Sequence, residues 1–381
     1  MPSPRIQVVV DGSPIDATVM AQLVRAEVRE SDRDPSVLAL RFTLVQRPDG
    51  EFAPIDDELF DPGTPIAFEV EPPGGTLQRL FDGFVTHLRP HFETIESNAY
   101  VEVLAMDAAV LLDAEERVAA WPNVKDSDVV SEVLSNYNIT ADVRDTDVQY
   151  DEDRQRLTQR ATDWRFLQLL ARRNGARFYF AYDQAQEAVV AHFGPPDVDG
   201  PPQPDVVLLQ EGQSLNWADL QLLATEPVKV KAAAIDPYAK QIVRGDGTPT
   251  LAVMGADDAA AAVESGLTSA GATASLALLH SPTPLDEAIG AETAAATDRA
   301  RFVIELRAEI DPALYRGLLR ARRPVLVRGV GRRFSGVFYV QSVRTVLENS
   351  ILLQSFVGTR NGTGQSGQES FGQSAEEVPA T

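Results

Sequence analysis

Two segments of the chain, residues 38–44 and 302–310, alternate large apolar side chains with small or polar ones. In a strand, this period of two sends one set of side chains into a core and the other toward solvent. Shorter apolar runs at 66–70, 84–88 and 100–106 are separated by turn segments such as "DPGTP" and "EPPGG". Short strands joined by Pro- and Gly-rich turns are typical of barrels and sandwiches. The first hundred residues are therefore predicted to be antiparallel β-structure.

Length and composition exclude several classes of protein. The chain has 381 residues and is 44% hydrophobic, which favours two to four globular modules. No stretch approaches the roughly 18 apolar residues of a membrane-spanning helix. The start, MPSPRIQVVVDGSP, lacks the basic and apolar regions of a secretory signal, and the absence of cysteine excludes thiol chemistry. We expect the protein to be made and folded in a cytoplasm.

The formal net charge is −22. Proteins that bind nucleic acids gain affinity by neutralising phosphates with lysine and arginine, and an acidic surface repels phosphates. We therefore expect no nucleic-acid binding.

Residues 116–195 have the pattern of a compact, inserted α/β module. Asp126 is placed to cap a first amphipathic helix. A second helix is predicted in "TDWRFLQLLARRNGARFYF", which begins at Thr162, with Trp164 and Leu167 on its apolar face. Gly175 supplies a left-handed helix stop, and alternating aromatic residues then predict a strand.

The predicted organisation follows from these patterns and from shifts in composition. A Pro- and Gly-rich stretch after the module indicates a linker, and an alanine-rich pattern beginning at Thr283-Pro284 indicates a late helix. The predicted parts are a first β-barrel region at 1–115, the module at 116–195, a linker with strands returning to the barrels at 196–250, a low-complexity mobile segment at 251–282, a helix and second β-barrel at 283–360, and a disordered tail at 361–381.

Two distant segments share a weak pattern. In the first, Pro65 begins a strand and "FDG" at 81–83 leads into a hairpin. In the second, Pro324 begins a strand and "FSG" at 334–336 leads into a hairpin that turns at 348–350. Either unrelated hairpins look alike here, or the chain contains two related barrels.

Motifs that carry chemistry are missing. His87 and His91 have helical spacing, but Pro90 stands between them and no third metal ligand is near. The loop "GVGRRFSG" at 329–336 is followed by a strand pattern, whereas a dinucleotide site needs a helix there. Carboxylate pairs are expected in so acidic a chain. No catalytic, metal-binding or cofactor-binding residue is predicted, and no cofactor.

Arginines crowd into one short stretch of this acidic chain. The stretch either forms a solvated face or contacts an acidic neighbour, because guanidinium groups pair bidentately with carboxylates. The stretch contains Arg316, Arg320, Arg322, Arg323, Arg328, Arg332 and Arg333. The interface candidates are Arg320, Arg322, Arg323, Arg332 and Arg333.

Four motifs in order resemble the baseplate hub family of contractile tails, which includes phage late-control protein D and the N-terminal hub region of VgrG. They are "LFDGFVTHLRPHF" with "YVEVLAMDAAVLL", then "WPNVKDSDVVSEVLSNYNI", then "QRATDWRFLQLLARRNGARFYF", and last "VLVRGVGRRFSGVFYVQSVRTVLENSILLQSFVGTRNG". The resemblance implies an α+β, mainly β fold with two tube-like antiparallel β-barrels and an inserted small α/β module. It also favours the second interpretation of the weak repeat.

The resemblance implies a structural, non-enzymatic hub of a phage tail or contractile injection system. A homotrimer would adapt the six-fold tail tube to a three-fold spike, alongside other baseplate proteins. A histidine common in the family near Arg344 is missing, and the spike is expected to be a separate protein. The motif residues that the resemblance marks as structural are Phe81, Gly83, Trp164, Leu167, Gly175, Phe334, Gly336 and Tyr339.

Two other functions compete with this one. A tail-associated cell-wall hydrolase would need an acid and a base placed in a cleft, and no stretch of the sequence suggests such a pair. A tail-tip surface-binding module would expose clustered aromatic residues. Only 7% of the residues are aromatic, and their spacing is that of a core.

Overall fold

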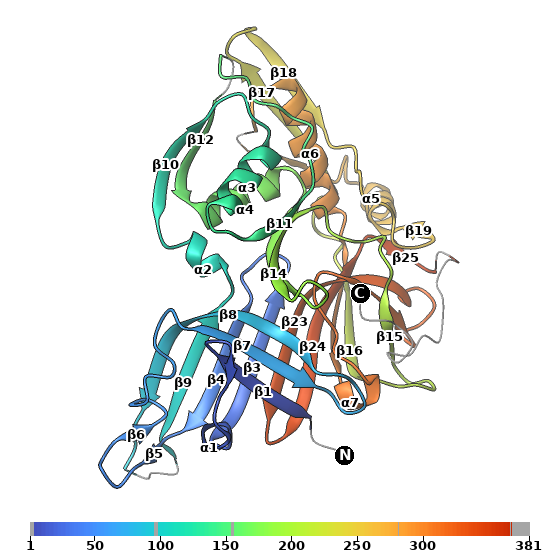
Figure 1. Cartoon of the computed structure of the whole chain (residues 1–381). Helices are drawn as coiled ribbons and strands as arrows, with labels where there is room; N and C mark the ends of the chain where they lie inside the picture. Colours follow the sequence, from blue (N-terminus) through green and yellow to red (C-terminus); the bar gives the residue numbers. More distant parts are fainter. Residues whose placement is uncertain (1–3, 95–97, 154–155, 281, 366, 368–381) are drawn as a thin grey trace.

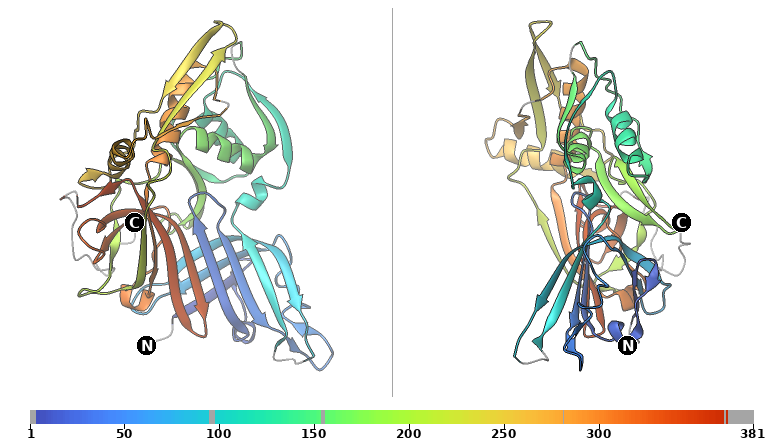
Figure 2. Two further views of the ribbon diagram at one scale, coloured as in Figure 1. Left: turned by 180° about the vertical axis from the view of Figure 1, so that it is seen from behind. Right: turned by 60° about the vertical axis from the view of Figure 1, so that its left-hand side comes forward.

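The computed structural model describes residues 4–94, 98–153, 156–280, 282–365 and 367. The fold is mainly β, as predicted. A broad sheet carries the N- and C-terminal parts of the chain, and an α/β module lies above it (Figure 1). The turned views in Figure 2 show the same arrangement from two further sides. None of the described helices is both long and apolar enough to cross a membrane.

The first half of the sheet comes from residues 5–106 and encloses its own apolar core. Leu38, Leu40 and Phe42 project into this core, so the predicted alternation is confirmed. The elements are β1 (Arg5–Val10), β2 (Ser13–Pro14), α1 (Ala17–Met20), β3 (Leu23–Ser31), β4 (Val37–Thr43), β5 (Val45–Gln46), β6 (Phe52–Ala53), β7 (Pro65–Glu71), β8 (Gln78–His91) and β9 (Tyr100–Met106).

The second half of the sheet has a separate core. Leu306, Ala308 and Ile310 project into it from the strand that the sequence predicted most clearly. The elements are β15 (Gln203–Val207), β16 (Leu215–Leu222), β21 (Ile304–Ile310), α7 (Pro312–Tyr315), β22 (Pro324–Arg328), β23 (Gly336–Glu348), β24 (Ile351–Arg360) and β25 (Gly362–Thr363).

The two halves form one sheet rather than two closed barrels. Thirteen strands hydrogen-bond in a continuous sheet, and β3 joins the halves by pairing with β23. One side of β23 is shared, because residues 336–339 pair with β22 and residues 342–348 pair with β3. The second half therefore continues into the first through the β3–β23 pairing, and the described strands contain no closed barrel.

The halves repeat each other strand by strand. The order β1-β7-β8-β9-β4-β3 in the first half corresponds to β15-β22-β23-β24-β21-β16 in the second. Bulges also recur at equivalent places. Thr86 forms a bulge in β8 opposite β9, and Gln341 forms one in β23 opposite β24. Val24 forms a bulge in β3 opposite β4, and Asn216 forms one in β16 opposite β21. β15 differs by running parallel to β22. The weak sequence repeat thus corresponds to a structural one.

The α/β module above the sheet has its own core, to which the alanine-rich helix α6 (Asp286–Ala300) contributes. Its elements are α2 (Ala109–Leu112), β10 (Glu116–Trp121), α3 (Asp126–Ser135), β11 (Thr140–Val143), β12 (Leu157–Thr162), α4 (Asp163–Arg173), β13 (Arg177–Asp183) and β14 (Ala188–Gly194).

Helix α4 forms as its sequence predicts. The Thr162 hydroxyl accepts the Arg165 amide at 3.3 Å and caps the helix. Trp164 and Leu167 are buried, and the Trp164 ring lies 5.4 Å from that of Phe178. Gly175 has φ +68° and supplies the left-handed stop.

The prediction that Asp126 caps α3 is wrong, because Lys125 is the N-cap residue. Asp126 lies in the first turn of the helix, and its carboxylate accepts hydrogen bonds from Arg173 and Asn174 at the end of α4. The Asp128 carboxylate caps instead, by accepting the Lys125 amide at 3.1 Å. Asp126, which the local pattern predicted as the cap, therefore makes a tertiary contact with the end of α4 instead.

Segment 251–282 contains more regular structure than its composition predicts. It includes β19 (Asp257–Asp258), β20 (Leu276–Leu278) and α5 (Ala259–Ser269), and Asp258 caps α5 by accepting the Ala261 amide. Ala260 and Val263 are buried in the second core. Alanine favours helix, so a segment poor in large side chains can still pack one face.

Two strands within 196–250 do not belong to the main sheet. β17 (Lys229–Asp236) and β18 (Gln241–Asp246) form a small sheet with β20 that packs on α6 (Asp286–Ala300). The sequence pattern missed β16, because its bulge interrupts the alternation. Most of the tail predicted at 361–381 lies outside the described residues.

Candidate functional site: the assembly surfaces

The junction of β3 and β23 carries a cluster of charges on one face. Arg344 donates to Glu27 through Nε at 2.8 Å and through Nη2 at 2.7 Å. Arg25 and Arg29 also donate to this carboxylate, at 3.0 and 2.6 Å, and Arg25 reaches Glu348 at 2.7 Å. One carboxylate thus holds three guanidinium groups across the joint between the halves.

This cluster sets the charge state of Glu27. Hydrogen bonds from Arg344, Arg25 and Arg29 outweigh burial and lower the pKa of Glu27 to about 2. Because the pKa in the folded protein lies below its ordinary value of 4.5, Glu27 stabilises the fold above about pH 4.5. That contribution is lost as the pH falls toward 2.

We expect Glu27→Gln to lower stability at neutral pH and to remove part of the acid sensitivity. Urea denaturation of both proteins between pH 7 and pH 2 measures this, and their midpoints should converge as the pH falls. Glu71→Gln is the control, because Glu71 lies 3.7 Å from exposed Arg5 in a looser pair. A midpoint difference for Glu27→Gln that stays constant down to pH 2 would contradict this account.

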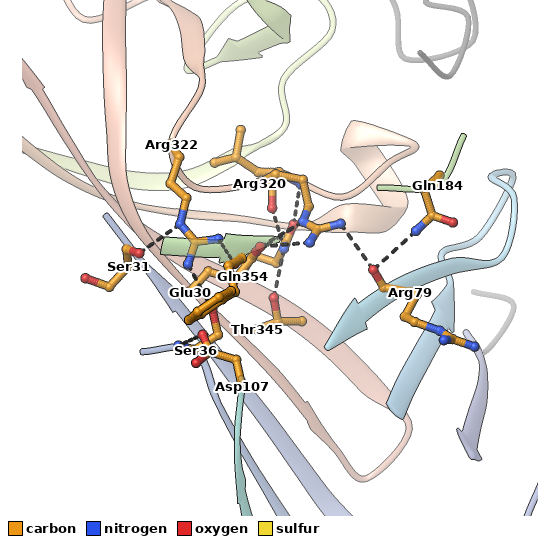
Figure 3. A network of polar contacts seen from close by, with 12 residues as sticks. Glu30, Ser31, Ser36, Arg79, Asp107, Gln184, Arg320, Arg322, Thr345 and Gln354 are labelled. Atoms are coloured by element: carbon orange, nitrogen blue, oxygen red, sulfur yellow. Dashed lines mark hydrogen bonds and ion pairs between the residues drawn. The ribbon is translucent and has the colours of Figure 1, made fainter. Parts of the chain in front are cut away.

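Arg322 and Arg320 hold the two halves and the module together from the inside (Figure 3). Buried Arg322 donates to the Ser31 carbonyl at 2.8 Å, the Phe180 carbonyl at 3.0 Å and the Ser36 hydroxyl at 2.9 Å. Arg320 pairs with Glu30 of β3 at 2.8 Å. These arginines therefore join segments that lie far apart in the sequence.

The five interface candidates of the arginine-rich stretch thus divide into two groups. Arg320 and Arg322 bind acceptors within the chain. Arg323, Arg332 and Arg333 are exposed, and the Arg333 guanidinium lies 5.5 Å from the Phe334 ring centre. Arg316, which belongs to the same stretch but is not one of the five candidates, is exposed as well.

Asp107, which sequence reasoning missed, belongs to the same buried region. Its carboxylate accepts the Ser36 amide at 2.6 Å and the Ala109 amide at 3.0 Å. Burial raises the pKa of Asp107 to about 6, although these amides and nearby Arg322 oppose the shift. The Ala109 amide is only two residues away, but the contact with Ser36 joins distant segments, and no local sequence signal marks it.

The motif residues of the two halves lie on equivalent strands but not at equivalent positions. Aligning the bulges matches Phe81 with Gly336 and Gly83 with Phe338, a displacement of two residues. A Cβ at Gly83 would lie 2.2 Å from the Met106 carbonyl oxygen, so β9 requires glycine there.

Gly336 is constrained differently. It has φ +144°, and a Cβ would lie 2.7 Å from the Arg360 guanidinium. That guanidinium is fully buried and donates to the Ser335 carbonyl at 3.2 Å. Tyr339 is 1% exposed, and Phe334 packs against the second core.

A cleft of about 500 Å³ opens beside the Glu27 cluster, on the face formed by β3, β4, β8 and β9. Arg41 and Glu102 in its wall pair at 2.6 Å. His87 also lines the cleft, whereas His91 contacts Glu93 at 3.0 Å. No group of three or more potential metal-ligating side chains occurs in the described part of the chain.

Comparison with known proteins identifies a family and a fold. The family model described as Alg8 N-terminal domain matches residues 3–349. No curated protein sequence matches the chain. A 43 kDa tail protein of prophage MuSo2 from Shewanella oneidensis is similar in structure, with a TM-score of 0.63, 12% identity, and coverage of 94% of this chain and 99% of that one.

Two further proteins are also similar in structure. One is the E. coli c3393 protein, described as a type VI secretion component resembling T4 tail proteins gp27 and gp5, with TM-score 0.54, 14% identity, and coverage of 94% and 77% of the two chains. The other is a chain of the Francisella PdpA–VgrG complex, with TM-score 0.55, 10% identity, and coverage of 97% and 59%. At these identities the likeness shows a shared fold.

Proposed function

Because the chain belongs to the Alg8 N-terminal domain family and has the fold of phage tail proteins, we propose that it is a structural baseplate hub. In this role, three copies adapt the six-fold tube of a contractile tail or injection system to a three-fold spike. The partners are the tube protein, a separate spike protein and other baseplate proteins. The role requires contacts rather than catalysis.

The strand-by-strand repeat is the observation that carries this proposal. Two equivalent half-sheets in one chain present two similar units side by side. Three such chains therefore supply six similar units toward a six-fold ring, while the chain itself repeats only three times toward the spike. The tail and secretion proteins that share the fold favour the same setting.

The alternative of a tail-associated cell-wall hydrolase has no specific observation in its favour. The charged groups beside the cleft, such as Arg41 and Glu102, are paired with each other. A surface-binding module is likewise unsupported, because Phe68, Phe81 and Phe338 are buried and the exposed aromatic side chains Phe92, Trp217 and Tyr238 lie on separate segments.

We expect the protein to assemble as a homotrimer. Multi-angle light scattering of the purified chain measures this directly, and cryo-electron microscopy counts the copies when assembly needs the tube or spike. A stable dimer in solution, or a single copy in the assembled particle, would overturn the proposal.

A further inference from the structure

β3 pairs with β23 inside the chain, but the strands equivalent to them, β16 and β8, do not pair with each other. The repeat equates β3 with β16 and β23 with β8. β3 pairs with residues 342–348 of β23 inside the chain. Among the described strands, β16 pairs only with β21, and residues 87–91 of β8 pair only with β9. β16 is the terminal strand of the sheet order, and residues 87–91 of β8 extend past the part of β8 that pairs with β7; such open edges are templates for strand pairing.

We propose that β16 of one copy pairs with the end of β8 of the next copy, in the register that β3 and β23 use within the chain. The bulges fix this register. When the bulge at Gln341 is aligned with the bulge at Thr86, Arg344 of β23 corresponds to Arg89 of β8. When the bulge at Val24 is aligned with the bulge at Asn216, Arg29 of β3 corresponds to Gln221 of β16. Since Arg344 lies opposite Arg29, Arg89 lies opposite Gln221 of the next copy. The inference rests on the proposed hub function and identifies the contact between copies of the chain.

The charges at the two edges match those of the internal joint. The same alignment equates Glu27 with Asp219, so the pair Glu27–Arg344 corresponds to Asp219 and Arg89 of neighbouring copies. Asp219 and Arg89 are both exposed. Neither has an ion-pair partner in the part of the chain that the structure describes. Pairing the edges would bring these opposite charges together.

Burial supports the same conclusion. Leu347 is 8% exposed where β3 covers β23, whereas its equivalent Phe92 is 57% exposed just beyond β8. On the other edge, Val28 is 1% exposed, whereas its equivalent Leu220 is only half-buried. Apolar side chains that the internal joint covers are thus left open at the free edges, and a second copy would cover them.

Pro90 costs this interface one hydrogen bond. The Asp32 amide donates to the Gln341 carbonyl, so in β23 the odd-numbered residues, including Thr345, direct their amides toward β3. Pro90 is the equivalent of Thr345 and has no amide proton. The Leu223 amide donates to Val303, so residues 218, 220 and 222 direct theirs toward the open side. All the other donors of the ladder are available.

Pairing of one edge with a different edge is head-to-tail, so it generates either a closed ring or an open filament. The hub requires the ring. The internal joint sets the relation between one half-sheet and the next, and the proposed contact repeats it between copies. The six half-sheets of a trimer then share one continuous sheet.

Disulfide trapping tests the register, because the chain has no cysteine of its own. Arg89→Cys and Gln221→Cys in one chain place thiols on directly opposed residues of neighbouring copies, within the separation that a disulfide spans. Under mild oxidation, most of the purified full-length chain should run as a covalent trimer on a non-reducing gel. The positive control is R29C/R344C, whose thiols face each other within one chain. It should form a disulfide, detected by mass spectrometry, without joining chains.

The negative control is R89C/R307C, because Arg307 is exposed but lies one strand in from the edge. It should stay uncrosslinked. Failure of R89C/Q221C to cross-link while R29C/R344C succeeds would overturn the strand pairing. If the cysteine-free parent is then still a trimer by light scattering, the hub proposal stands without it. A ladder of covalent species extending beyond the trimer would also overturn the closed contact.

Discussion

Replacing Arg322 with alanine is expected to lower the free energy of unfolding by about 3–5 kcal/mol. The guanidinium donates to three acceptors from β3, the β3–β4 turn and β13, and it stacks 4.3 Å from the Tyr179 ring centre. Truncation leaves these buried acceptors without a donor. It also removes the positive charge that favours ionised Asp107, so the pKa of Asp107 should rise further.

Equilibrium urea denaturation measures this loss, and the neighbouring residue provides a matched control. Arg323→Ala removes an equal side chain from an exposed position, so its effect should stay within about 0.5 kcal/mol. Arg322→Lys, which keeps the charge but not the forked donors, should fall between the two. Equal stability of R322A and R323A would show that the buried network does not hold the halves together.

Replacing Gly83 with alanine should cost about 3 kcal/mol, because it forces apart two paired strands. The new Cβ would meet the Met106 carbonyl oxygen at 2.2 Å and the Asp107 Cα at 2.9 Å. All its nearest neighbours are backbone atoms, so no side-chain rotation relieves the clash. The strain falls beside Asp107 and should spread to the junction with the module.

Gly290→Ala tests whether the loss is specific to position 83. Gly290 lies within α6, and a Cβ there meets nothing within 4 Å. Alanine favours helix over glycine by about 0.5–1 kcal/mol, so G290A should raise the urea midpoint. A G83A protein as stable as the parent would show that β8 and β9 separate easily, which would contradict the close approach of Gly83 to the Met106 carbonyl.

Local pattern was enough for much of the secondary structure. The alternation at 38–44 and 302–310 gave two central strands, and the cap, stripe and glycine stop of α4 were all read correctly. Each depends on interactions within one or two turns or along one strand. The same approach failed where distant residues compete, as at Asp126, or where a bulge shifts the alternation, as in β16.

The arginine-rich stretch shows the limit most clearly for the candidate site. Arg322 and Arg323 are identical neighbours in the sequence, yet one is buried and one is exposed. The left-handed backbone at Arg322, with φ +71°, turns its side chain inward, and its acceptors come from residues more than a hundred positions away.

The sequence by itself determined the mainly β fold, the inserted module and the resemblance to tail hubs, because periodicity and motif order are local properties. Only the tertiary structure decided which charges are internal, how closely the halves repeat, and which strand edges remain open. Those features depend on register and on contacts between distant segments, and a one-residue change of register exchanges the buried and exposed faces of a strand. No local pattern contains that information.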